Sequence, residues 1–347
     1  RFPRQPSRRF PDAIPTGNVV ENNRIGLSLN DVMLPQEKGV YVQGIGNTIQ
    51  NNNISGNSIA GIDILGDSNS ILHNLIATDR TGNEARPNTE FGILITSSNN
   101  TVSGNTISGN GSGVTIIRPV EDPKIEASGN RILGNYIGTN STGTTALPGQ
   151  THGVAIANGA DNNTIGGTTA GSRNVISANT QVGISIQPGP VPAASAPFRT
   201  KIQGNYIGTN AAGTAAIPNG IIGIEISETL ETLIGGFGAD MPGARNVISG
   251  NSQHGILLRS NTLNTRISGN YIGTGTGGGT AQPAFQTLAT AINVESATTT
   301  YFSFLYRVTA DAFAIQTLSM NGVFPILTSV VLFGGMVVIM ARMDWVL

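Results

Sequence analysis

The sequence has no cysteine, a single tryptophan and few charged residues, and each shortage narrows the classes of protein to consider. Without cysteine there are no disulfides and no thiolate metal ligands, and with three histidines there is no zinc signature. Charged residues make up 11% of the chain and the net charge is −1, whereas phosphate backbones require a basic surface. The basic cluster within residues 1–9 indicates a solvated tail. Nucleic acid is therefore not an expected partner.

Glycine is abundant, at 46 residues, but it does not recur at every third position as a collagen requires. Isoleucine and valine recur at regular intervals, which a disordered chain would not show. The composition therefore predicts an ordered, turn-rich, all-β protein. No cofactor is expected, because no motif for one occurs.

A short element of glycine, aliphatic, any residue and aliphatic recurs along the chain. After most copies, two shorter elements of asparagine, any residue and aliphatic follow. Alternating aliphatic residues place one face of a strand inward, and glycine or asparagine permits a bend at each corner. The pattern predicts a parallel β-solenoid with three short strands per coil, about 8–9 coils, and stacked asparagines between coils. The copies are GVYV (39–42), GIDI (61–64), GILI (92–95), GVTI (113–116), GVAI (153–156), GISI (183–186), GIEI (223–226) and GILL (255–258).

The alternation also assigns side chains to the inside and the outside of the solenoid. The residues expected inside are Val154, Ile156, Ile165, Ile176, Ile184, Ile186, Ile224, Ile226, Ile248 and Ile256. The residues expected in one outward column are Asp63, Leu94, Thr115, Ala155, Ser185, Glu225 and Leu257. The heptapeptide GNYIGTN at 134–140 and 204–210 repeats after two coils. Long loops at 76–95, 137–156 and 207–226 align end to end and should project as one ridge.

These repeats carry a family resemblance. The segments NNTIGGTTAGSRNVISAN (162–179) and GNYIGTNAAGTAAIPNG (204–220) resemble repeats of large bacterial cell-surface and secreted β-helix proteins. The chain from about 18 to 297 resembles the right-handed parallel β-helix proteins of the pectate-lyase-like superfamily. That superfamily includes lyases, glycoside hydrolases, epimerases, adhesins and structural modules, so the resemblance implies the fold and not one activity. Residues 1–17 would be an arginine- and proline-rich leader.

The C-terminal residues 298–347 differ in character and are expected to form a hydrophobic helical tail. Residues 305–347 are similar to the second and third membrane helices of ABC exporters, and 323–341 contain no charge over 19 residues. No ATP-binding G-x-x-x-x-G-K-[ST] motif occurs, which favours a fused or truncated fragment over a transporter. A hydrophobic anchor is the alternative, with membrane contact through 323–341. The residues that carry the resemblance are Arg307, Val308, Thr309, Asp311, Gly322, Pro325, Asp344 and Trp345.

The residues for carbohydrate chemistry are sparse. Asp63 and Glu225 are the acids of the outward column, and several coils separate them, so they do not form a calcium site. Arg199 and Arg259 have no carboxylate at a pairing distance in sequence. His152 and His254 precede strand glycines as in polygalacturonase-like enzymes, but without an acid pair they indicate corner residues. The sequence therefore predicts no catalytic residues and no metal site; GGFGAD at 235–240 resembles a calcium repeat but occurs once.

The most polar loop covers 77–90, and its sister loops are rich in threonine, alanine and glycine. Its charged residues are the candidate ligand-binding set: Asp79, Arg80, Glu84, Arg86 and Glu90. The favoured function is a non-catalytic, extracellular or bacterial cell-surface module for adhesion, glycan contact or scaffolding, with a polysaccharide as partner. The alternatives are a polysaccharide lyase or epimerase, and a membrane protein fragment related to ABC exporters.

Overall fold

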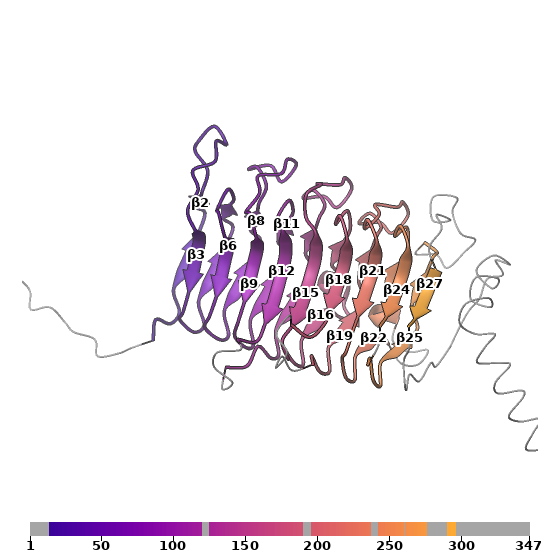
Figure 1. Ribbon diagram of the computed structural model, residues 1–347. Helices are drawn as coiled ribbons and strands as arrows, with labels where there is room; N and C mark the ends of the chain where they lie inside the picture. The colour runs from indigo at the N-terminus through magenta and orange to yellow at the C-terminus, as the bar shows by residue number, and fades with distance from the viewer. Residues whose placement is uncertain are drawn as a thin grey trace, which may run out of the picture.

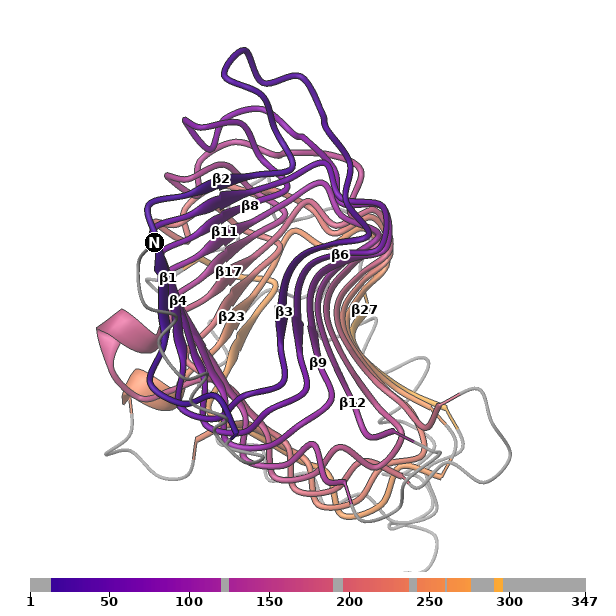
Figure 2. The ribbon, with the colours of Figure 1, turned by 90° about the vertical axis from the view of Figure 1, so that its left-hand side faces the viewer.

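The computed structural model describes residues 14–119, 125–189, 196–236, 242–259, 261–275 and 290–295. These residues wind through nine coils of three short strands each, and every strand pairs in parallel with its equivalents in the neighbouring coils. Figure 1 shows the coils stacked along one axis as a rod, and Figure 2 shows the three-sided cross-section. The predicted parallel β-solenoid with three strands per coil is confirmed.

The strands fall into three sheets of nine. The first sheet contains β1 (Val19–Glu21), β4 (Thr48–Gln50), β7 (Ser70–Leu72), β10 (Thr101–Ser103), β13 (Arg131–Leu133), β16 (Thr164–Gly166), β19 (Lys201–Gln203), β22 (Leu233–Gly235) and β25 (Arg266–Ser268). The second contains β2 (Arg24–Ile25), β5 (Asn53–Ile54), β8 (Leu75–Ile76), β11 (Thr106–Ile107), β14 (Tyr136–Ile137), β17 (Val175–Ile176), β20 (Tyr206–Ile207), β23 (Val247–Ile248) and β26 (Tyr271–Ile272). The third contains β3 (Lys38–Val42), β6 (Ala60–Ile64), β9 (Phe91–Ile95), β12 (Ser112–Ile117), β15 (His152–Ala157), β18 (Val182–Ile186), β21 (Ile222–Ile226), β24 (His254–Leu258) and β27 (Thr290–Val294).

Aliphatic side chains from all three sheets fill the interior of the rod as one continuous cluster. All ten aliphatic residues expected inside are fully buried there, which confirms the prediction from alternation. The registers explain the continuity: Val154 lies opposite Ile184, and Ile184 lies opposite Ile224. Each coil therefore covers the apolar face of the next, which no coil could do alone.

Asparagine ladders join the coils at the corners, as the sequence predicts. In the longest ladder, each asparagine donates to the side-chain oxygen of the asparagine one coil further along, through its backbone N–H in every case but Asn174, which uses its side-chain amide. The ladder consists of Asn23, Asn52, Asn74, Asn105, Asn135, Asn174, Asn205, Asn246 and Asn270. Buried amides become tolerable because the next coil supplies their partners.

The long loops between the second and third strands occur in alternate coils and stack on one another. The Ser141 backbone N–H donates to the Gly82 carbonyl at 2.9 Å, and the Ala211 N–H donates to the Gly143 carbonyl at 2.8 Å. These loops form the row at the top of Figure 1, so the predicted ridge is present. Short 3-10 turns, η1 (Ala170–Ser172) and η2 (Pro242–Ala244), occur in the loops between the first and second strands.

The predicted helical tail at 298–347, with its exporter-like residues and the apolar stretch 323–341, lies outside the described residues. Within the ranges that the structure describes, no helix has the length and apolar character needed to cross a bilayer.

Candidate functional site

The third sheet bends so that its outer face is concave along the whole rod (Figure 2). The bend occurs at the glycine that follows the first residue of each strand of this sheet from β3 to β24. At Gly153, an added Cβ would lie 2.5 Å from the Gly183 carbonyl oxygen of the next coil, so only glycine permits this spacing. The side chains before each glycine and two residues after it therefore converge on the outside. Ser112 and Thr115 show this, with their hydroxyl oxygens 2.9 Å apart.

We refer to the outward side of β3 to β27 as the concave face. The predicted outward column is present there, because residues 63, 94, 115, 155, 185, 225 and 257 are in register from strand to strand. Several of its members are nevertheless almost inaccessible: Asp63 is 3% exposed and Ser185 is 2% exposed.

A polar centre lies at the N-terminal end of the concave face. Lys38 Nζ is 2.7 Å from Asp63 Oδ2 in the next coil and 4.5 Å from the centre of the Tyr41 ring. Its hydrogen bond with Asp63 raises the pKa of Lys38 above the usual value, against the effect of burial. Asp63 Oδ1 has no hydrogen-bond partner within the described protein. Tyr41 is 47% exposed, so an aromatic ring is accessible beside this ion pair.

A cavity of about 600 Å³ adjoins this centre, at the corner where the third sheet passes to the first. Gln43, which lines it, donates to the Tyr41 hydroxyl at 3.1 Å and so joins the cavity to the concave face. Its walls combine apolar side chains with carboxylates. They include Ile14, Gln43, Ile45, Leu65, Asp67, Ser98, Ile125 and Glu126.

A second polar centre lies near the C-terminal end of the face. Arg259 Nε is 2.5 Å from Glu225 Oε1, and Arg259 NH1 is 3.2 Å from Glu295 Oε2. The expectation that Arg259 is unpaired is wrong, because Glu225 precedes it by one coil and not by a short sequence interval. Arg199 likewise pairs with Glu231, at 2.8 Å. Coil stacking brings together charges about 30 residues apart.

Two histidines face the same side. His152 and His254 are the first residues of β15 and β24, which agrees with their prediction as corner residues. Burial lowers the pKa of His152 below its usual range, and the charge of Glu225 opposes that shift. Burial also lowers the pKa of His254, whose Nδ1 atom has no hydrogen-bond partner in the described protein. Both imidazoles are therefore neutral at pH 7.

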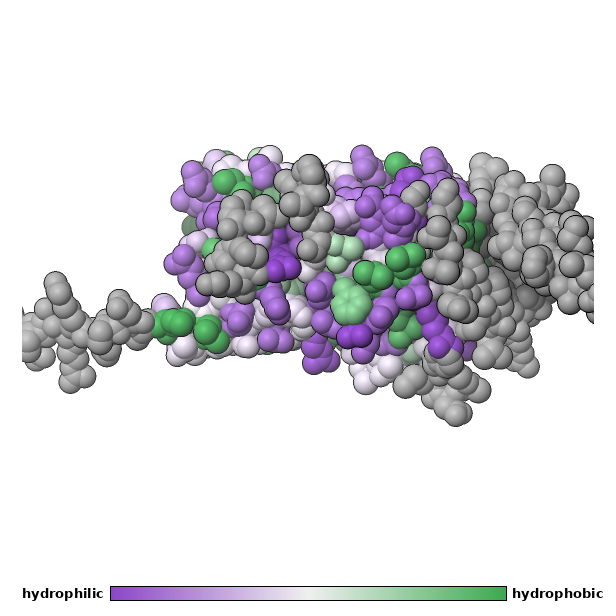
Figure 3. All heavy atoms as spheres, turned by 60° about the horizontal axis from the view of Figure 1, so that its bottom comes forward, coloured by the Kyte–Doolittle hydropathy of each residue, from purple (hydrophilic) through white to green (hydrophobic). Residues whose placement is uncertain are grey.

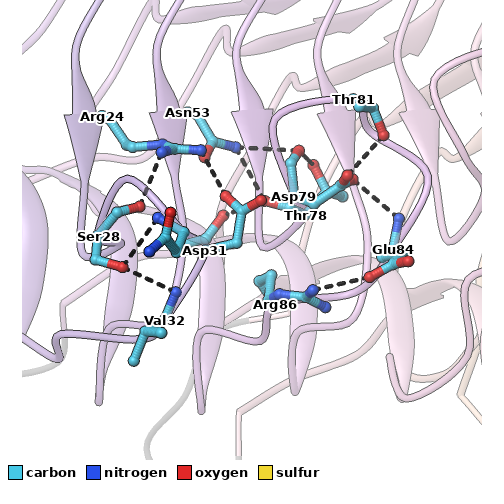
Figure 4. Close-up of polar contacts among 12 residues, drawn as sticks. Arg24, Ser28, Asp31, Val32, Asn53, Thr78, Asp79, Thr81, Glu84 and Arg86 are labelled. Carbon is cyan, nitrogen blue, oxygen red and sulfur yellow. Dashed lines mark hydrogen bonds and ion pairs between the residues drawn. The ribbon is translucent and has the colours of Figure 1, made fainter.

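The predicted ligand-binding loop at 77–90 lies on the ridge, and its acid Asp79 stabilises the loop itself (Figure 4). Asp79 Oδ1 accepts the N–H groups of Asn83 and Glu84 at 2.8 and 3.0 Å, and Oδ2 accepts the Thr81 hydroxyl at 2.6 Å. Burial alone would raise the pKa of Asp79, but these hydrogen bonds lower it below the usual value. The side chain of Asn140 accepts the corresponding N–H groups in the next ridge loop.

The other four charged residues of that loop do not share one environment. Glu84 and Arg86 form an ion pair of 2.8 Å, whereas Arg80 and Glu90 are exposed. The structure thus brings together Glu84 and Arg86 and does not gather all five residues into one site. Ligand binding by this loop stays a prediction.

The corner between the third and first sheets presents a second kind of surface. Phe198, Leu230 and Leu263 pair in parallel, one per coil, and are partly exposed. Arg199 stacks on Phe198, 4.2 Å from the ring centre. Figure 3 shows hydrophobic side chains grouped among polar ones on this side of the rod. Polar residues flank this apolar column, so it is not one large apolar patch.

Among the residues that the structure describes, no three His, Asp or Glu side chains are grouped to hold a metal ion. Sequence analysis missed Lys38 and Tyr41, and it missed the partner of Arg259. The signal for Lys38 and Tyr41 lay in their positions, directly before and two residues after a strand glycine, because both positions face outward.

The family model described as right handed beta helix region matches residues 15–221, which is more than half of the chain. No curated protein sequence matches. The Azotobacter vinelandii mannuronan C-5 epimerase AlgE6 A-module is similar at 15% identity, with a TM-score of 0.43 over 77% of this chain and 60% of that one. The pectate lyase Pel9A is similar at 13% identity, with a TM-score of 0.41 over 86% of this chain and 82% of that one. The chain spans 60% of the AlgE6 A-module, and at these identities the likeness extends no further than the fold.

Proposed function

Since the chain belongs to the right-handed β-helix family, whose stacked coils present long straight faces, we propose that its concave face binds a polysaccharide outside the cell without chemical conversion. The concave face carries this proposal as a continuous surface over nine strands, with the half-exposed Tyr41 ring and two ion pairs along it. These pairs are Lys38–Asp63 and Arg259–Glu225, whose cations are partly exposed. Sugar hydroxyls can donate to such carboxylates and accept from such cations.

The shape of the surface supports a polymer over a small ligand. Asp63 and Glu225 lie five strands apart in the third sheet, a separation of roughly 24 Å at the usual strand spacing. Rigid side chains line the floor between them, because the strands fix their positions. A ligand that contacts both polar centres must therefore be extended along the rod.

Affinity electrophoresis tests the proposal. The full chain is run through gels that contain galactomannan, xyloglucan, dextran, alginate or polygalacturonate. We expect retardation by at least one polymer, and we expect Ala155→Trp, which fills the middle of the concave face, to abolish it. The matched control is Lys201→Trp on the exposed side of the first sheet, which should leave retardation unchanged. Free migration in all five polymers, or equal loss in both variants, would refute the proposal.

The second candidate function is a polysaccharide lyase or epimerase. The observation that favours it is a neutral imidazole, His152, on the same face as Glu225 and two strands away. A neutral histidine can accept a proton from a sugar carbon next to a carboxylate. Incubation with alginate and polygalacturonate, followed by ultraviolet absorbance of unsaturated ends and NMR of the uronate composition, tests it. If the native chain forms product and the His152→Gln variant does not, the protein is an enzyme and not a binding module.

A further inference from the structure

We propose that the concave face selects uncharged polysaccharides over uronate polymers, with Tyr41 as the platform for a sugar ring. This inference deepens the proposed function, because it depends on the same face and names the class of ligand. The evidence is the charge arrangement of the face and its margin, together with the accessible ring beside a buried carboxylate.

Carboxylates outnumber cations on this surface. On the concave face, Lys38 is held by Asp63, and Arg259 is shared between Glu225 and Glu295. Two cations thus face three carboxylates there. A uronate would have to displace a carboxylate that the protein already supplies, and the remaining carboxylates would repel it.

The adjoining cavity adds to this imbalance. Asp67 and Glu126 line it, and Arg118 at its edge donates to the Ile125 carbonyl at 3.2 Å. With these residues, three cations, Lys38, Arg118 and Arg259, stand against five carboxylates. These carboxylates therefore outnumber these cations by two. Neutral histidines at 152 and 254 leave this balance unchanged at pH 7.

The N-terminal centre has the parts that an uncharged sugar ring requires. A sugar ring has an apolar face bordered by hydroxyl groups, and the half-exposed Tyr41 ring offers a flat apolar partner for that face. Phe91, in the coil after Asp63, is partly exposed on the same side. Hydroxyls around a ring on Tyr41 would meet the Lys38–Asp63 pair and Gln43, which offer donors and acceptors without excess positive charge.

The test compares neutral and acidic polymers with charge variants. We measure dissociation constants of the full chain for galactomannan and alginate at low and moderate salt. The native chain should bind galactomannan more tightly at both salt concentrations. Tyr41→Ala should weaken galactomannan binding about tenfold. The control Leu29→Ala removes an apolar side chain that is 86% exposed on a ridge loop, and it should change nothing.

Asp63→Asn removes the carboxylate that pairs with Lys38, and Glu225→Gln removes one that pairs with Arg259. Both substitutions preserve the shape of the side chain. Each variant should strengthen alginate binding about fivefold at low salt, and moderate salt should remove the gain. Thermal unfolding checks that each variant is folded. If Asp63→Asn proves destabilised, the alginate affinity of Glu225→Gln decides the test. Tighter binding of alginate than of galactomannan by the native chain would overturn the inference and leave the proposed function standing. Unchanged alginate affinity in the folded charge variants would also overturn it.

Discussion

Asn135 donates both its backbone N–H and its side-chain amide to Asn174 Oδ1 in the next coil, at 2.8 and 3.0 Å. Its own side-chain oxygen accepts the same pair of donors from Asn105 in the coil before. One side chain therefore connects three coils. From Asn52 to Asn246 the side chains of this ladder are buried, so this corner of the rod depends on buried amides.

Replacing Asn135 with alanine should lower the free energy of unfolding by about 3 kcal/mol, because several buried donors and acceptors lose their partners. Urea unfolding followed by circular dichroism measures the change. Asn30→Ala, in an exposed loop, is the control and should stay within about 0.5 kcal/mol of the native chain. Equal stability of the two variants would contradict the role of the ladder.

Gly153→Ala should destabilise the rod by about 2 kcal/mol or more, since the new methyl group would meet the Gly183 carbonyl and the Ile176 side chain at 2.5 and 2.6 Å. Gly171→Ala is the matched control, because nothing lies within 4 Å of its added methyl group. Differential scanning calorimetry of both variants measures the effect. A melting temperature for Gly153→Ala equal to that of the control would show that the coils can move apart.

Asp79→Asn should preserve the ridge loop, because Asn140 and Asn210 accept the same turn N–H groups in the sister loops. Asp79→Ala should lower stability by about 1 kcal/mol. The lowered pKa of Asp79 implies that its charged form stabilises the fold above the unfolded value of 3.8. That contribution disappears as the pH falls through the folded value. Acid unfolding curves of the native chain and Asp79→Asn should differ there and agree at pH 7.

Glu225→Gln should lower the pKa of His152 further, because the Glu225 carboxylate opposes the effect of burial. NMR titration of the imidazole, assigned with His152→Gln, measures this. Glu228→Gln, an exposed acid just after the same strand, is the control. The lowered pKa also means that stability falls as the pH drops below 6.5, since the unfolded chain binds the proton first. His152→Gln should reduce that acid slope.

Much of the fold follows from the sequence because each coil repeats the same local requirement. The glycine of GISI (183–186) and the aliphatic residues after it predict a bend and two inward side chains, and Ile184 and Ile186 are indeed buried. The parallel stacking of coils then follows from the repetition, because each strand has nearly the same pattern of inward aliphatic residues as the equivalent strand in the next coil.

The candidate site could be predicted only in part. Asp63 and Glu225 were placed on the outward column, but their partners Lys38 and Arg259 lie in neighbouring coils, at intervals set by loop length. A charge pair across coils has no fixed spacing in the sequence. The charged loop shows a second limit of the sequence: the structural role of Asp79, whose carboxylate closes a turn that asparagine closes elsewhere, depends on loop geometry that composition does not reveal.

The absence of native cysteine permits the most direct test that the concave face binds polysaccharide. Single cysteines are introduced at Ala155, in the middle of the concave face, and at Lys201, on the outside of the first sheet, and their alkylation rates are measured with and without galactomannan. Galactomannan should slow alkylation at position 155 at least several-fold and leave position 201 unaffected. Equal rates with and without the polymer at position 155, or equal slowing at both positions, would contradict the account.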